Sequence, residues 1–118
     1  MMITLRVAAV TAASLLAGRF HNHLVKSMPG AGQTLAGSPA EVRLWFNERP
    51  EVPFTSVTIL RADSSKVATI RAVATDDTLA VSAPLPAPLP AATYVVQWRT
   101  ASSDGHAIRG RFEFTIAP

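Results

Sequence analysis

The sequence predicts an all-β domain, a Greek-key sandwich or barrel of about seven strands. Polar and apolar residues alternate with period two over several short runs, and helical periodicity is weak. Nine prolines divide the 118 residues into short segments, although 48% of the chain is hydrophobic. Turn-forming residues separate these runs. A chain of this length is expected to form one domain with a single core.

The first 20 residues have the features of a signal peptide. Arg6 supplies a short positive region, and an apolar stretch at 7–17 follows that is too short to span a membrane. Cleavage before His21 would leave Phe20 at the last leader position, where small residues are the rule. Cuts two or three residues earlier would leave extra residues ahead of His21. We expect export, with residues 21–118 as the mature domain.

Charge and cysteine content exclude several classes of protein. Arg6 and Arg19 lie in the leader, so nine basic and eight acidic residues remain and the mature charge is +1. Because these basic residues are scattered along the sequence, they do not indicate nucleic-acid binding. The chain has no cysteine, which excludes disulfides and thiolate metal sites.

The strands are expected in the following order. The run at 41–46 begins with strict alternation, and the run at 54–60 places Val57 and Ile59 on one face. Two shorter strands at 67–73 and 78–81 are joined by a turn at Asp76-Asp77, and the clearest C-terminal strands are 94–99 and 111–116. Turn signals stand at 29–32, 37–39, 49–53 and 84–90. The last is rich in proline, and we interpret it as a connection between strands rather than as a ligand for a proline-recognising domain.

All three histidines lie in two short segments far apart in sequence. His21 and His23 follow the leader, and Asp104 and His106 lie on a glycine-containing turn. Each segment alone has an ordinary interpretation, a solvated strand start and a hairpin turn. Together they offer nitrogen and carboxylate ligands without thiolate, a set that suits tetragonal Cu(II) better than Mg²⁺ or Ca²⁺.

Four motifs strengthen the copper interpretation. They are His-x-x-Leu-Val-x-Ser from His21, Ser-Pro-x-x-Val-x-Leu-x-Phe-x-Glu at 38–48, Thr-Tyr-x-Val-x-Trp-Arg at 93–99, and Ser-x-Asp-x-His at 102–106. In this order they resemble the CopC family of periplasmic copper-resistance proteins, and the resemblance covers residues 21–116. It implies an immunoglobulin-like β-sandwich or barrel that binds one Cu(II) near one end.

The resemblance also implies the ligands. They are His21, through its α-amine and Nδ1, together with Asp104 and His106. Glu48 matches a family glutamate near the site, where it could accept a hydrogen bond from a ligand, or it could be a solvated strand-end residue. If His21 is first, His23 is third and could assist through an X-X-His mode. That mode deprotonates backbone amides and would break the pairing of the first strand.

Methionine content distinguishes the chain from family members with a second, Cu(I) site. Those members carry a methionine-rich loop in mid-chain, whereas here the corresponding residues 61–75 contain none. The three methionines are Met1, Met2 and Met28. Because thioether ligands select Cu(I), we expect a single Cu(II) site.

The predicted function is periplasmic Cu(II) binding in copper buffering, delivery or resistance. The expected molecule is a monomer that binds no nucleic acid and has an inner-membrane copper transporter as the implied partner. The alternative is a metal-free immunoglobulin-like adhesion or scaffolding module. An oxidative copper enzyme would need an open coordination position and a flat substrate face. We expect no enzyme, because Trp45 and Trp98 both lie in strands predicted to be buried.

Overall fold

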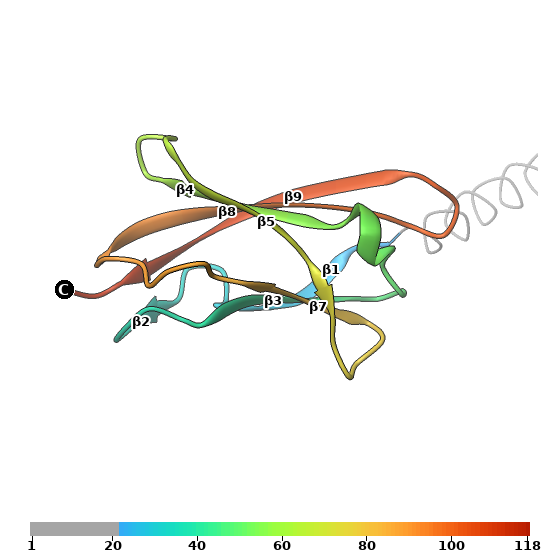
Figure 1. Cartoon of the computed structure of the whole chain (residues 1–118), viewed down its shortest axis with the longest axis horizontal. Coiled ribbons are helices and arrows are strands. Elements are labelled where there is room, and N and C mark those ends of the chain that lie inside the picture. Colours follow the sequence, from blue (N-terminus) through green and yellow to red (C-terminus); the bar gives the residue numbers. More distant parts are fainter. Residues whose placement is uncertain (1–21) are drawn as a thin grey trace, which may run out of the picture.

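The computed structural model describes residues 22–118, which form a sandwich of two β-sheets (Figure 1). One sheet has the order β1 (Leu24–Met28), β3 (Glu41–Phe46), β7 (Ala80–Pro84) and β6 (Val73–Ala74). The other has the order β2 (Thr34–Leu35), β9 (Ala107–Ile116), β8 (Ala92–Ala101), β4 (Ser56–Arg61) and β5 (Lys66–Arg71). Seven of these strands have at least five residues, which confirms the expected all-β class. The leader predicted at 1–20 lies outside the described residues.

Alternation in the sequence becomes the two faces of each strand. In β3 the side chains of Val42, Leu44 and Phe46 are buried, and the residues between them face outward. Trp45 is one of these outward residues, so the prediction that it is buried is wrong. It is half-buried on the outer face, where the Lys26 ammonium lies 4.6 Å from its ring centroid.

The strands that border the turn between β8 and β9 extend further than the sequence indicates. The sequence predicts strands at 94–99 and 111–116, but the two pair continuously from Ala92↔Ile116 to Ala101↔Ala107. Polar residues on the outer face do not end a strand whose neighbour continues to supply hydrogen bonds.

A short 3₁₀ helix, Val52–Phe54, replaces the start of the strand expected at 54–60, and it contains Pro53. No helix within 22–118 has the length and apolarity needed to cross a membrane.

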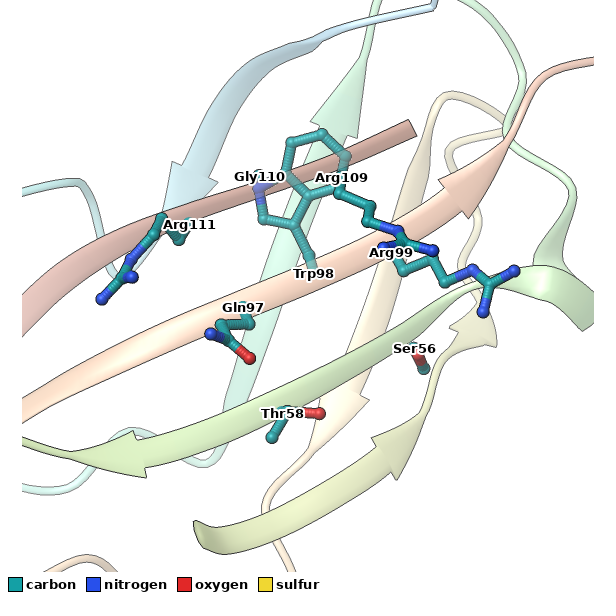
Figure 2. Close-up of a pocket in the computed structure, with 8 residues that line it drawn as sticks. All are labelled: Ser56, Thr58, Gln97, Trp98, Arg99, Arg109, Gly110 and Arg111. Carbon is teal, nitrogen blue, oxygen red and sulfur yellow. The ribbon is translucent and has the colours of Figure 1, made fainter. Parts of the chain in front are cut away.

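Trp98 anchors the core between the sheets, as predicted. Its indole is 7% exposed and meets the ring of Phe46 edge-on, with centroids 5.4 Å apart. Gly110 lies opposite Trp98 on β9, and a Cβ atom there would lie 2.4 Å from Cζ2 of the indole. The absence of a side chain at Gly110 therefore makes room for the tryptophan (Figure 2).

The proline-rich segment 84–90 connects β7 to β8, as the sequence predicts. Leu89 of this segment is buried, and its N–H donates to the Ser38 hydroxyl oxygen at 2.8 Å. The Tyr94 hydroxyl donates to the Pro90 carbonyl at 2.6 Å. These contacts hold the connection against the sandwich.

Candidate metal centre

The turn between β8 and β9 carries two of the predicted ligands. The Gly105 N–H donates to the Ser102 carbonyl at 2.9 Å, and the Ser102 N–H donates to the His106 carbonyl at 3.1 Å. Gly105 has φ +87°, a left-handed conformation that glycine adopts without strain. The turn is thus an ordinary hairpin connection, and it also presents Asp104 and His106 together on a short, hydrogen-bonded loop.

Asp104 is the hydrogen-bonding centre of this turn. Its Oδ1 accepts from the Ser102 hydroxyl and from the His106 backbone N–H at 3.1 Å, and its Oδ2 lies 2.8 Å from His106 Nδ1. The Ser102 hydroxyl, followed by the imidazole and N–H of His106, holds the pKa of Asp104 well below its usual range. The carboxylate is therefore ionised at neutral pH and fixes the orientation of the imidazole.

Solvent can reach both side chains. The His106 side chain is 71% exposed and that of Asp104 is 49% exposed. A neutral imidazole with its proton on Nδ1 facing a carboxylate presents the Nε2 lone pair to a metal. The pair has the geometry of a histidine ligand oriented by an aspartate.

The start of the described chain is tied to the end of β3. The His23 N–H donates to Asn47 Oδ1 at 2.6 Å, and the Asn47 N–H donates to the His23 carbonyl at 3.1 Å. The Glu48 N–H lies 3.4 Å from Asn22 Oδ1. Asn22 is 3% exposed, and its buried Nδ2 has no hydrogen-bond partner among residues 22–118. These contacts fix the residue that follows His21.

The segment after β3 also reaches the β8–β9 hairpin. The Glu51 N–H donates to the carbonyl of Ala101, the last residue of β8 before the turn. The start of the described chain and the β8–β9 turn therefore lie at the same end of the sandwich (Figure 1). The structure thus places at one end of the sandwich two segments that are about 80 positions apart in sequence.

The structure places the predicted ligands only in part. His21 lies outside the described residues. Within 22–118, no third histidine or carboxylate joins Asp104 and His106 in a group that could hold a metal ion. His23 is exposed at the start of β1, and Glu48 is half-buried two residues after β3.

Sequence reasoning misses the residues that support the predicted ligands. In the motifs Asn22 is only a spacer between two histidines, and Asn47 is one variable position. Ser102 belongs to the turn motif, but the donation of its hydroxyl to Asp104 emerges only from the structure. The one feature of the sequence that could have indicated these supporting residues is a polar residue close in sequence to each predicted ligand.

Comparisons with known proteins agree with this architecture. Residues 24–117 match the family model of the CopC domain. The chain is 36% identical over 104 residues to "Copper resistance protein C" of Escherichia coli, an alignment that covers 81% of each chain. It is 31% identical over 97 residues to "Copper transport protein CutJ" of Bacillus subtilis, covering 81% of this chain but 18% of that longer protein.

A solved structure gives the same result. The crystal structure of CopC from Methylosinus trichosporium OB3b superposes with a TM-score of 0.77 at 34% identity, covering 83% of this chain and 95% of that one. The sheet order, the hairpin that carries Asp104 and His106, and the family match along nearly all of the described residues lead to one conclusion. This chain belongs to the CopC family.

Proposed function

We propose that this protein binds Cu(II) outside the cytoplasm and takes part in copper buffering, delivery or resistance. The observation that carries the proposal is the Asp104–His106 pair, with 2.8 Å between His106 Nδ1 and Asp104 Oδ2, on a hydrogen-bonded turn at the end of the sandwich where the described chain begins. Relatives named for copper resistance and copper transport support it. In this role copper is cargo that the protein takes up and releases.

The proposed ligands are His21, Asp104 and His106. An α-amine and an imidazole on one residue close a chelate ring, so the second donor binds without a further loss of chain freedom. The amine has an ordinary pKa of about 7.7–8.0, so copper can displace its proton near neutral pH. Asp104 would supply an oxygen while its contact with Nδ1 keeps the His106 ring in position. Glu48 is proposed as a hydrogen-bond acceptor near this set.

An X-X-His mode through His23 is a weaker account. It requires deprotonation of the His23 backbone amide, and that N–H donates to Asn47 Oδ1 at 2.6 Å. The mode would also pull the chain away from the Asn47 N–H. Breaking these two hydrogen bonds would lower the stability of the fold. Binding through Asp104 and His106 leaves both hydrogen bonds intact.

The predicted leader and the family support a proposal for the cellular setting. We propose periplasmic localisation after removal of residues 1–20, a monomeric state, no enzymatic activity and one Cu(II) per chain. Met28 is exposed at the end of β1 far from His23, so it does not supply a thioether to this set. An inner-membrane copper transporter is the proposed partner for copper exchange.

A copper titration of protein beginning at His21 tests the proposal. We expect one tight equivalent of Cu(II), with a tetragonal spectrum dominated by nitrogen ligands. Two tight equivalents, or tight Cu(I) binding, would refute the single-site assignment. No measurable Cu(II) affinity would favour a metal-free scaffolding module instead.

A further inference from the structure

The outer face of the five-stranded sheet carries a concentration of arginine near the β8–β9 turn. Arg71, Ser56, Arg99 and Arg109 form one row across β5, β4, β8 and β9, because each is the register partner of the next. Arg111 ends the neighbouring row on β9. The remaining members of that row are polar and uncharged: Thr69, Thr58 and Gln97. We call the four arginines and these polar neighbours the arginine face, and Figure 2 shows its members on β4, β8 and β9.

The arginine face gathers charge that the chain as a whole does not have. Residues 22–118 contain nine basic and eight acidic side chains, and four of the nine basic ones lie here. None of these four guanidinium groups lies within 4.0 Å of a described carboxylate. Glu113, two residues after Arg111 on β9, and Glu51, near the turn, are the flanking acidic residues.

The arrangement of Arg99 and Arg109 is unfavourable for the isolated domain. They are direct cross-strand partners, and like charges in that position repel. Figure 2 shows both side chains extending in the same direction, toward the end of β8 that leads into the turn. An external anion between them would attract both guanidinium groups and offset this repulsion. Guanidinium groups bind carboxylates in a bidentate, directional way.

An exposed aromatic side chain borders the arginine face. Phe54 of the 3₁₀ helix is 67% exposed. It lines a groove with Arg71 and Arg99 on one side, and a groove with Ser102 and Gly105 of the metal-site turn on the other. Aromatic residues and arginine are the types most enriched in the energetic centres of protein interfaces.

We propose that the arginine face and Phe54 form the docking surface for a protein partner with a carboxylate-rich segment. Arg99 and Arg109 are two residue pairs from the Ala101↔Ala107 pair that closes the turn, a separation of about 7 Å along the strands. A partner bound there would lie next to His106. This placement rests on the proposed copper function, since it makes the surface the site where a copper-exchanging protein docks.

A protein fits this surface better than a membrane does. Hydroxyl and amide side chains, Ser56, Thr58 and Gln97, stand between the arginines in the same hollow and offer directional hydrogen bonds to a peptide. Binding to a bilayer surface draws on apolar side chains that enter the interface in addition to electrostatic attraction to anionic lipids. In the described residues bordering the arginine face, Phe54 is the large apolar side chain that is exposed.

The test uses the copper-free secreted protein and a fluorescent 12-residue peptide of alternating glutamate and glycine with one central leucine. We expect the double variant Arg99→Gln/Arg109→Gln to bind this peptide at least tenfold more weakly than the parent. The matched control, Arg61→Gln/Lys66→Gln, removes the same charge at the other end of β4 and β5 and should stay within twofold. Phe54→Ala should weaken binding while leaving the net charge unchanged.

Localisation by NMR completes the test. Peptide addition should shift the backbone amide signals of Phe54, Arg99 and Arg109 more than those of Arg61 and Lys66. Equal loss in both double variants would mean that binding follows net charge alone, and the proposal would be wrong. Arginine-dependent binding to phosphatidylglycerol vesicles in place of the peptide would also overturn it. Because the peptide test contains no copper, its result does not depend on the copper titration. A failed copper titration would not overturn the docking surface, and a failed peptide test would not overturn the copper site.

Discussion

At the scale of single residues, Asp104 has two functions that the sequence could not separate. One oxygen closes the turn by accepting from Ser102 and from the His106 N–H, and the other holds the His106 ring through Nδ1. A carboxylate that only ligated copper would not need these contacts. The lowered pKa of Asp104 follows from them and keeps the carboxylate ionised at neutral pH.

His106→Ala should weaken Cu(II) binding by about a hundredfold or more while the fold remains intact, because the side chain is 71% exposed. Loss of a supporting hydrogen bond near a metal costs about 10–100-fold, and loss of a ligand costs at least as much. Asp104→Asn should weaken binding less, by about tenfold, since the amide retains an oxygen. Competition titrations would measure both, and parent-like affinity in both variants would favour the His23 mode.

The proximity of Asp104 and His106 was predictable from the sequence. His106 and Asp104 share a short motif, and the spacing that makes the turn also brings their side chains together. Asn22 and Asn47 could not be found in this way, because their contacts join residues 24 or more positions apart. The prediction that Trp45 is buried is wrong, since a strand with a buried face also has an outer face.

At the scale of elements, the β3 end and the β8–β9 hairpin position the site. Asn47 fixes the chain immediately after His21 through its contacts with the N–H and carbonyl of His23. The alternation of polar and apolar residues predicted both ends of β3 correctly. The ends of β8 and β9 could not be predicted in this way, because they depend on hydrogen bonds between the two strands.

Asn47→Ala should lower Cu(II) affinity by about tenfold, because the α-amine would then be held less firmly near His106. The free energy of unfolding should fall by about 1 kcal/mol from the lost hydrogen bond. Asn47→Asp is the matched control, because its carboxylate can still accept from the His23 N–H. Copper affinity that is unchanged in Asn47→Ala would show that this anchor does not shape the site.

Gly110→Ala should destabilise the hairpin and the core beneath it. The added Cβ would meet the Trp98 indole at 2.4 Å, and overpacking of this kind costs about 1–3 kcal/mol. Gly37→Ala is a suitable control, since no atom lies within 4 Å of its added Cβ, and its effect should stay within about 0.5 kcal/mol. Urea unfolding monitored by tryptophan fluorescence would measure both. Equal stability of the two variants would contradict the packing described for Trp98.

At the scale of the whole molecule, the sandwich brings the start of the described chain and the β8–β9 turn to one end (Figure 1). The four motifs indicated the family through their resemblance, and the alternation and turn residues that recur along the chain predicted the all-β class. That the start of the chain and the β8–β9 turn share one end of the sandwich depends on the order of strands in the sheets, in which β1 lies next to β3 and β9 lies next to β8. The arginine face likewise arises only when four strands align.

The central claim is that His21 contributes its α-amine to the copper site, and adding one residue ahead of it tests this claim most directly. The extension turns the amine into an amide, which is no longer a basic donor, and the chelate ring is lost. Each tenfold change in affinity corresponds to about 1.4 kcal/mol, so loss of a chelating amine should weaken Cu(II) binding by several decades. Competition titrations of the His21-start protein and the extended protein, side by side at one pH, should give that difference. Equal affinities would contradict the assignment of the site.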